Sequence, residues 1–203
     1  QHGRKFPWRE TRDPYKILVS EVMLQQTQVS RVLQKYPKFI KSFPDFKTLA
    51  QASLKDCMMA WQGMGYNRRA LYLRHSAQRI VHEWNGKLSS SPEALEQLPG
   101  IGRATARAIA AFAFNQQVVF IETNIRSVFI HEFFKNQSRQ VRDADIMPLV
   151  EKTLDRTNPR EWYWALMDYG AMLKKAGNPS RQSAHHTRQA PFTGSRRELR
   201  GKI

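Results

Sequence analysis

Apolar residues recur along most of this chain at intervals of three and four positions, which places them on one face of an α-helix. The pattern predicts helices over residues 14–34, 67–84, 103–114, 123–135, 145–155 and 158–175. The one apolar run with strand character, residues 118–121, is short enough to be a buried connector. The sequence therefore predicts an all-α fold.

Residues typical of helix N-caps mark three further boundaries. Ser53 precedes Asp56 by three positions, which fits a capping box ahead of a short apolar helix. Ser91 is followed by a proline, and Asn158 by a proline and then by Glu161 at the capping-box position. We expect each of these residues to begin a helix.

The net charge of the chain indicates which class of partner it binds. Lys and Arg total 33 against 17 Asp and Glu, which gives a formal net charge of +16 and a pI of about 10.4. Such an excess indicates a polyanionic partner, and nucleic acid is the first candidate. A membrane is the competing one, but no apolar run approaches the roughly 20 residues that span a bilayer, and no signal-peptide pattern is present. We expect a cytoplasmic, nucleoid-associated protein.

Cysteine usage limits the metal chemistry. Cys57 is the sole cysteine, which excludes an intramolecular disulfide, a four-cysteine zinc site and a cysteine-ligated iron–sulfur cluster. His185 and His186 are adjacent and would point in different directions on any regular element, so they do not indicate a metal pair. We therefore predict no metal site.

A glycine-containing segment between two predicted helices fits a phosphate site. The string is Leu98-Pro99-Gly100-Ile101-Gly102, followed by Arg103-Ala104-Thr105-Ala106. Its glycine pair permits positive φ, and its backbone N–H groups join the positive end of the next helix. A single Gly-x-Gly is common in ordinary turns, so the specificity lies in the longer string.

This string and several others resemble the helix-hairpin-helix superfamily of DNA glycosylases, and within it the adenine-excising MutY branch. The other matching segments are Phe6-Pro7-Trp8-Arg9, Arg12-Asp13-Pro14-Tyr15, Ser20-Glu21-Val22-Met23-Leu24-Gln25-Gln26-Thr27-Gln28-Val29, Trp61-Gln62-Gly63-Met64-Gly65-Tyr66 and Ala165-Leu166-Met167-Asp168-Tyr169-Gly170-Ala171-Met172. The likeness runs colinearly from residue 1 to about 173.

The resemblance implies a fold of two lobes with the active site in the cleft between them. A glycosylase domain is expected over residues 1–175, followed by a basic C-terminal tail over residues 176–203. The central lobe would span about 15–135, and the second lobe would combine 1–14 with 136–175.

Excising a base requires an acid that protonates the leaving base and a carboxylate that stabilises an oxocarbenium-like sugar. Glu21 lies among apolar neighbours, where partial burial would raise the pKa of its carboxyl. Glu122 precedes a predicted helix whose N-terminus favours an ionised carboxylate. By resemblance Glu21 is the general acid, Glu122 the carboxylate and Asn124 the amide that helps to hold it. By position alone, the glutamates fit a salt-bridging surface residue and an N-terminal cap.

The chain departs from the family at four positions. Glu122 stands where the family has the Asp of an Asp-x-Asn motif, and Asn67 replaces a second aromatic residue after Tyr66. Ala104 stands where lyases of the superfamily carry a Schiff-base lysine, which implies an enzyme without lyase activity. Lys174 stands where the first of four cluster cysteines is usual, which implies that no iron–sulfur cluster is bound.

The resemblance also assigns residues that would reach the flipped base and its partner strand. Gln26 and Tyr66 correspond to wedge residues, and Thr27 would lie beside the opposite base. Arg12, Trp8 and Leu24 would line the base pocket, although Trp8 can equally be a core residue. The hairpin contacts to DNA would come from Leu98, Gly100, Ile101, Gly102 and Thr105, with room for a monovalent cation.

The function implied is that of a monomeric, monofunctional DNA glycosylase of base excision repair. It would act on double-stranded DNA and excise adenine opposite 8-oxoguanine or guanine. The departures keep two alternatives open, namely a thymine or uracil mismatch glycosylase and a damage-binding protein that has lost catalysis. The tail, which includes Arg188, Arg196, Arg197 and Arg200, either contacts phosphates or is solvated.

Overall fold

The computed structural model describes residues 3–186 and Gly194, and within this part of the chain every named element is helical. The elements are α1 (Pro14–Leu24), α2 (Val29–Ser42), α3 (Phe46–Gln51), α4 (Leu54–Trp61), α5 (Arg68–Glu83), α6 (Pro92–Glu96), α7 (Arg103–Phe114), α8 (Thr123–Phe133), α9 (Asp143–Thr153), α10 (Pro159–Ala176) and the 3-10 helix η1 (Pro179–Gln182). The expected all-α fold is confirmed.

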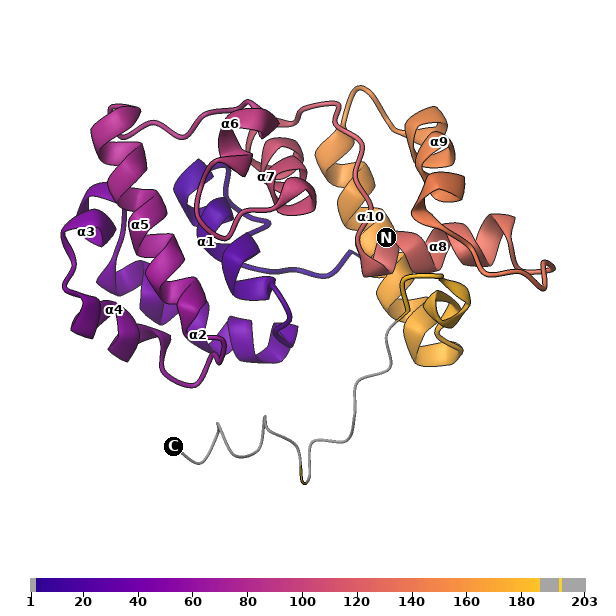
Figure 1. The fold of residues 1–203 in the computed structure, drawn as a ribbon, viewed down its shortest axis with the longest axis horizontal. Helices are drawn as coiled ribbons and strands as arrows, with labels where there is room; N and C mark the ends of the chain where they lie inside the picture. Colours follow the sequence, from indigo (N-terminus) through magenta and orange to yellow (C-terminus); the bar gives the residue numbers. More distant parts are fainter. Residues whose placement is uncertain (1–2, 187–193, 195–203) are drawn as a thin grey trace.

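The helices form two groups, α1–α7 and α8–η1 (Figure 1). In the first group, α1 packs on α7 and α2, and α3 packs on α5. In the second group, α8 packs on α9, α10 and η1. The boundary between the groups thus falls after α7, whereas the sequence places it near residue 135. The N-terminal segment contacts both groups, because Arg4 and Arg9 bind Asp168 of α10 and Trp8 packs on Tyr36 of α2.

The two groups share one continuous core. Phe112 of α7 stacks on Trp164 of α10 with 5.9 Å between ring centroids. The connector 118–121 has no strand structure, and Phe120 is buried against Tyr163 at 4.1 Å. Residues 118–121 are therefore the buried connector that their length allows.

The helix expected over residues 14–34 is two helices. Gln25 leaves the helical region with ψ of 113°, and Gln26 has a φ of 52°, which breaks the hydrogen-bond ladder. The buried guanidinium of Arg69 donates to the carbonyl groups of Val22 and Met23 at 2.9 and 3.0 Å, and so satisfies the end of α1. A distant side chain thus stabilises a break that the apolar spacing does not reveal.

All three residues predicted to begin a helix are N-caps, and two of them cap through their side chains. The hydroxyl groups of Ser53 and Ser91 accept from the backbone N–H of the third helical residue, at 3.0 and 3.3 Å. Asn158 is the N-cap residue of α10, as expected, but its side chain makes no cap bond among the described residues. Asp155 instead accepts from the backbone N–H of Asn158 at 3.0 Å.

The described part of the predicted tail packs on the second group. The side-chain amide of Gln182 donates to the carbonyl groups of Phe134, Gln137 and Arg139 at 3.2, 2.6 and 3.2 Å. Ser183 is buried and pairs in an isolated bridge with Val141. The expectation of an extended arm from residue 176 is therefore wrong as far as residue 183. The basic residues Arg188, Arg196, Arg197 and Arg200 lie outside the described residues.

Candidate active site

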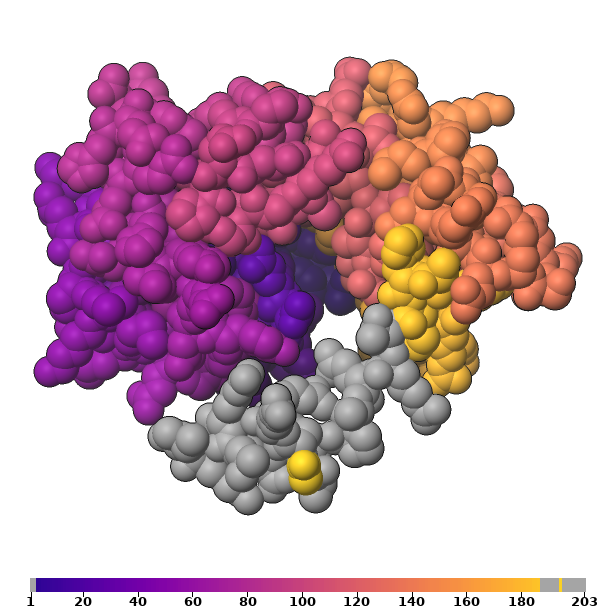
Figure 2. Space-filling view, viewed as in Figure 1, coloured from indigo at the N-terminus to yellow at the C-terminus, as the bar shows by residue number. Residues whose placement is uncertain are grey.

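A hollow separates the surfaces of the two groups. Figure 2 shows it between the magenta-to-pink helices of the first group and the orange-to-yellow helices of the second, with the indigo N-terminal part of the chain at its floor. Glu21 on α1 and Glu122 at the start of α8 come from opposite groups. The negative charge of Glu122 raises the pKa of Glu21, so the two carboxyl groups are close enough to interact electrostatically.

The carboxyl group of Glu21 retains its proton at neutral pH. Burial raises its pKa from 4.5 to about 8, the negative charge of Glu122 adds to this shift, and the positive charge of Arg9 opposes it. Glu21 follows the buried residues Ile17 and Leu18 on α1, one turn earlier. The helix face that anchors α1 in the core therefore also desolvates this carboxyl group.

The carboxyl group of Glu122 sits in a cradle of donors at the N-terminus of α8. Its Oε1 accepts from the backbone N–H of Asn124 and Ile125 at 2.7 and 3.0 Å, and its Oε2 accepts from the Asn124 amide at 3.2 Å. Burial raises the pKa of Glu122, whereas the two backbone donors and the charges of Lys174 and Arg126 lower it, with a net upward direction. These donors favour the ionised form of Glu122, whereas burial and the charge of Glu122 both favour the protonated form of Glu21.

An ion pair that the sequence did not single out borders this site. Arg9 donates both guanidinium NH₂ groups to Asp168 on α10, at 2.9 and 3.0 Å. Burial opposes the ionisation of Asp168, but the hydrogen bonds from Arg9 and Arg4 outweigh it and lower its pKa. Asp168 thereby holds Arg9 where its charge acts on Glu21. Arg9 and Asp168 both lie in segments that carry the family resemblance, and this shared membership is the sequence feature that could have indicated their role.

Close packing of α10 places the start of α8. A Cβ atom at Gly170 would lie 2.2 Å from the backbone oxygen of Asn124 and 2.7 Å from its Cβ. Only a residue without a side chain allows α10 to approach the backbone beside Glu122 this closely.

The predicted phosphate site has an open helix end. Gly100 has a φ of 75° and lies over the ring of Tyr72, where a Cβ atom would approach Cδ2 to 2.7 Å. Gly102 is the N-cap of α7 with a φ of −89°, so Gly100 alone supplies the positive φ of this turn. No side chain among the described residues caps α7. Its first N–H groups therefore face outward, as an anion site requires.

The side chains expected at the hairpin have two different roles in the fold. Leu98 and Ile101 are buried and anchor the turn in the core. The Gln25 amide donates to the Gly100 carbonyl at 3.1 Å and to the Thr105 hydroxyl at 3.3 Å, so it ties the hairpin to the end of α1. The monovalent cation expected at the hairpin stays a prediction.

The two expected wedge residues share one support. Gln26 and Tyr66 are exposed and have φ of 52° and 48°. Arg69 lies between their turns, and its NH2 group donates to the Thr27 hydroxyl at 2.9 Å and to the Gly65 carbonyl at 3.1 Å. Arg69 was not predicted, because its buried position at the start of α5 is not visible in a basic stretch of sequence.

Comparison with known proteins identifies the family. The sequence profile described as "HhH-GPD superfamily base excision DNA repair protein" matches residues 19–157. The chain belongs to the HhH-GPD superfamily of base excision DNA repair proteins. The matched part contains Glu21, the hairpin and Glu122, whereas Arg9, Asp168 and Gly170 lie outside it.

Several curated relatives carry the name "Adenine DNA glycosylase". The protein from Buchnera aphidicola subsp. Baizongia pistaciae is 37% identical over 87% of this chain and 51% of its own length. That from Mycobacterium tuberculosis is 35% identical over 98% of this chain and 72% of its own. The human protein is 34% identical over 85% of this chain and 34% of its own. The chain thus spans about half of the Buchnera protein and a third of the human one.

Solved HhH-GPD structures share the fold. A structure titled as a thermostable thymine-DNA glycosylase superposes with a TM-score of 0.75 at 25% identity, covering 90% of this chain and 88% of the other. An endonuclease III–DNA complex superposes with a TM-score of 0.66 at 19% identity over 100% and 91% of the two chains. The expected helix-hairpin-helix glycosylase fold is therefore confirmed.

The residues expected to line a base pocket lie in different surroundings. Trp8 is 5% exposed and packs on Phe6 and Tyr36 with ring centroids at 5.0 and 5.4 Å, as a core residue does. Arg12 has 61% of its side chain exposed and lies 3.8 Å from Glu161 on α10. Leu24, the last residue of α1, is half-buried. Their role in a base pocket of this HhH-GPD protein stays a prediction.

The residues do not fit an iron–sulfur cluster. Cys57, the sole cysteine, is buried in α4 with its thiol against the Ala70 carbonyl, and Lys174 occupies the last turn of α10. In the described part of the chain, no group of three or more His, Cys, Asp or Glu side chains is placed to hold a metal ion.

No helix described by the structure is long and apolar enough to cross a membrane.

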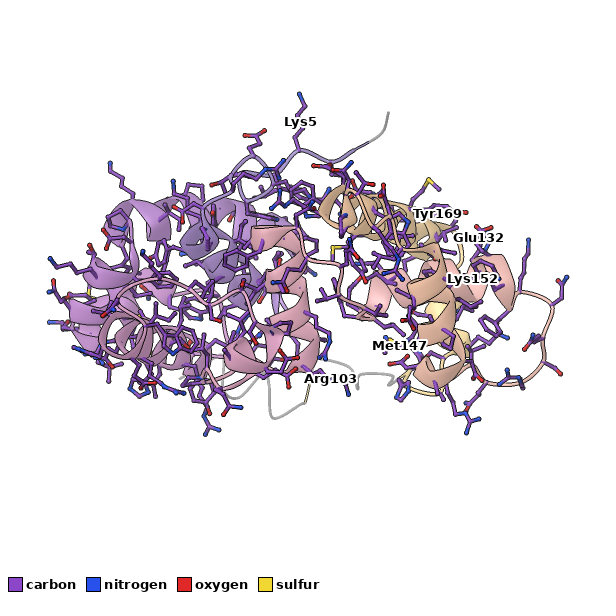
Figure 3. All side chains as sticks on the ribbon, turned by 90° about the horizontal axis from the view of Figure 1, so that it is seen from above. Lys5, Arg103, Glu132, Met147, Lys152 and Tyr169 are labelled. Carbon is purple, nitrogen blue, oxygen red and sulfur yellow. The ribbon has the colours of Figure 1, made fainter. Side chains whose placement is uncertain are left out.

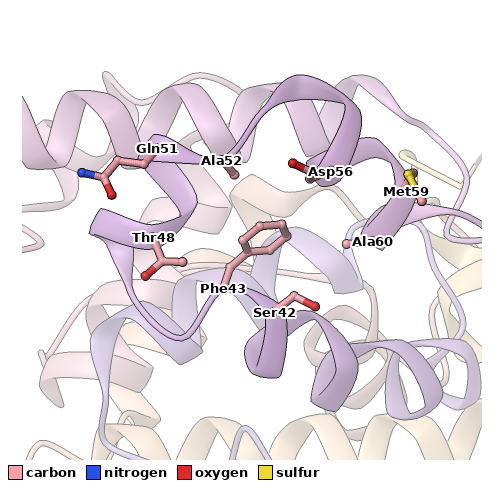
Figure 4. A pocket seen from close by; sticks show the side chains of 8 residues that line it. All are labelled: Ser42, Phe43, Thr48, Gln51, Ala52, Asp56, Met59 and Ala60. Atoms are coloured by element: carbon pink, nitrogen blue, oxygen red, sulfur yellow. The ribbon is translucent and has the colours of Figure 1, made fainter.

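Other surface features lie apart from these residues. A pocket between the end of α2, α3 and α4 is lined by residues such as Phe43, Thr48 and Met59, and by none of the candidate site residues (Figure 4). Tyr169 of α10 donates its hydroxyl to Glu132 of α8, and Figure 3 shows the two side chains next to each other. This hydrogen bond is a second contact between α10 and α8, in addition to the close approach of Gly170 to Asn124.

Proposed function

We propose that this protein is a monofunctional DNA glycosylase that hydrolyses the N-glycosidic bond of adenine mispaired with 8-oxoguanine or guanine in duplex DNA. The observation that carries the proposal is the pair of unlike carboxyl groups. Glu21 keeps its proton, while Glu122 rests among donors that favour its anion. The relatives named "Adenine DNA glycosylase" support adenine as the base.

In this proposal each carboxyl group has one task. Glu21 donates its proton to the departing adenine, which would otherwise leave as an anion. Glu122 stabilises the positive charge that develops on the sugar, and water then completes the hydrolysis. Ala104, exposed at the start of α7, offers no amine for a Schiff base, which supports hydrolysis without strand cleavage.

The flipped base is reached from the hairpin side. The open N-terminus of α7 supports a phosphate contact, and the exposed Gln26 and Tyr66 support insertion into the stack that the base leaves. Both wedge turns rest on Arg69, so they would enter the duplex as one unit.

Excision measured in a single turnover tests the proposal. Duplexes with A:8-oxoguanine, A:G, T:G and U:G pairs are treated with alkali or heat, which cleaves abasic sites. We expect cleavage at adenine that disappears in Glu21→Gln, because the amide cannot donate the proton. Cleavage only at T or U would move the substrate to that of the structural neighbour titled thymine-DNA glycosylase. Intact binding without any cleavage would contradict the proposed activity.

Shortening the side chain at position 122 distinguishes an active enzyme from a damage-binding protein, because Glu122 is one methylene longer than the Asp of the family motif. Asp can also cap α8, but its carboxyl group would lie about one bond length further from the sugar. An enzyme adapted to Glu122 should therefore lose excision rate in Glu122→Asp, by up to roughly a hundredfold. A binding protein that lost catalysis through this residue should instead gain activity. Single-turnover rates of the two proteins on A:8-oxoguanine decide between these outcomes.

A further inference from the structure

Lys174 reaches back along α10 to the start of α8. It lies one turn after Gly170, on the helix face that contacts Asn124. Its Nζ donates to Asn124 Oδ1 at 3.4 Å, and its side chain is half-buried. This contact joins the last turn of α10 to the residue that also contacts Glu122.

The Asn124 amide connects this lysine to Glu122. Its oxygen accepts from Lys174, and its NH₂ group donates to Glu122 Oε2 at 3.2 Å. A cation on one side and a carboxylate on the other define one orientation of the amide. The reverse orientation would place the amide NH₂ group against the lysine ammonium and the amide oxygen against the carboxylate. Lys174 therefore fixes which end of Asn124 faces Glu122.

The other charges around Glu122 are already engaged. Arg126 of α8 forms a two-point ion pair with Asp143, at 2.7 and 2.8 Å. Arg9 of the N-terminal segment is bound to Asp168, and Glu21 of α1 is protonated at neutral pH. Among the described residues, Lys174 forms no ion pair with a carboxylate within 4 Å, so its charge acts on Glu122 without local compensation.

We propose that Lys174 is a positioning residue that, through Asn124, holds the Glu122 side chain in place and favours its ionised form. The inference deepens the proposed glycosylase function and rests on it. It assigns to the last turn of α10 a share in the electrostatics of the site, although Lys174 touches neither the base nor the sugar in this proposal.

The pH dependence of excision tests this role. Rates on A:8-oxoguanine duplex are measured between about pH 5 and pH 9 for wild type, Lys174→Met and Lys174→Arg. Loss of a positive charge favours the protonated form of Glu122, so the acid limb in Lys174→Met should move up by about one pH unit. The rate should therefore fall most on the acid side of the profile and least on its plateau, and Lys174→Arg should restore the wild-type profile.

Lys175→Met is the matched control, because it removes the same charge from the next, exposed position of α10. A loss that only affects packing would lower the rate by one factor at every pH. That result, or an equal shift in Lys175→Met, would overturn the proposal. The pKa of Glu122 can also be followed without catalysis, from the ¹³C shift of its carboxyl group against pH in wild type, Lys174→Met and Lys175→Met. The signal is assigned with Glu122→Gln. If wild type excises no base, the glycosylase proposal fails, while this titration still decides the effect of Lys174.

Discussion

The carboxyl group of Glu21 is poorly solvated when charged, so catalysis and stability make opposite demands on it. Its pKa is about 8 in the folded protein against an ordinary 4.5. Below the lower pKa both the folded and the unfolded chain hold the proton, so the raised pKa has no effect on the free energy of unfolding. As the pH rises, the unfolded chain releases its proton first, so stability is lost progressively until the folded pKa is passed.

Glu21→Gln should therefore stabilise the protein while it abolishes excision. The amide is neutral at every pH, so the gain should be near zero at about pH 4 and roughly 2–3 kcal/mol near neutrality. Urea unfolding at several pH values measures it. Glu151→Gln, at an exposed position of α9, is the control and should change little. A gain that does not depend on pH would contradict a raised pKa at Glu21.

Sequence reasoning found the residues whose chemistry is local and missed those that depend on distant partners. Glu122 and Asn124 are two positions apart, so a helix start predicts their contact. Arg9 and Asp168 are far apart along the chain, and neither residue type indicates the other. Lys174 is one of two adjacent lysines, and only the packing of α10 on α8 distinguishes it from Lys175.

At the scale of elements, the packing of α10 on α8 sets the position of Glu122, the proposed catalytic carboxylate. A methyl group at Gly170 would overlap the Asn124 backbone, which cannot move without the start of α8. Gly170→Ala should therefore displace Glu122, lower the excision rate at least tenfold and destabilise the fold by about 1–3 kcal/mol. Single-turnover rates and thermal unfolding measure the two effects.

Gly177→Ala is the matched control for this change. Gly177 follows α10 with a φ of −163°, and a Cβ atom there would meet nothing within 4 Å. Its substitution should leave rate and stability unchanged. Equal behaviour of the two alanine variants would show that the close approach at Gly170 does not position α8.

The missed elements have two physical causes. The apolar period continues from α1 into α2, so it predicts one helix, but Arg69 accommodates the break by binding carbonyl groups from two turns. Helix α3 has six residues, which is too short for a clear period. Longer helices such as α7 and α10 agree with the sequence to within about two residues, because their own apolar faces specify them.

At the scale of the whole molecule, residues 176–203 combine two parts with different roles. Residues up to 183 belong to the fold, since Gln182 satisfies three carbonyl groups after α8 and Ser183 is buried. The composition of the chain does not reveal this, because the segment is polar and basic throughout. A truncation designed from sequence alone, after Lys175, would therefore remove structure together with charge.

Truncation after His186 isolates the charge. Residues 187–203 hold five basic side chains and one acidic side chain, so the formal net charge falls from +16 to +12. If the tail binds DNA, the slope of log K against log salt should fall by about 0.9 for each phosphate that the tail neutralises in the full chain. Fluorescence anisotropy with a duplex over a salt series measures the slope, and thermal unfolding of the same variant measures any change in stability.

Truncation after Lys175 should instead lower the melting temperature, because it removes η1 and the Gln182 bonds. The two truncations thus distinguish loss of fold from loss of charge. An unchanged salt slope after removal of 187–203 would show that the basic tail neutralises no phosphates. The excess positive charge of the remaining chain, with the hairpin and the hollow between the two groups of helices, would then have to account for DNA affinity on its own.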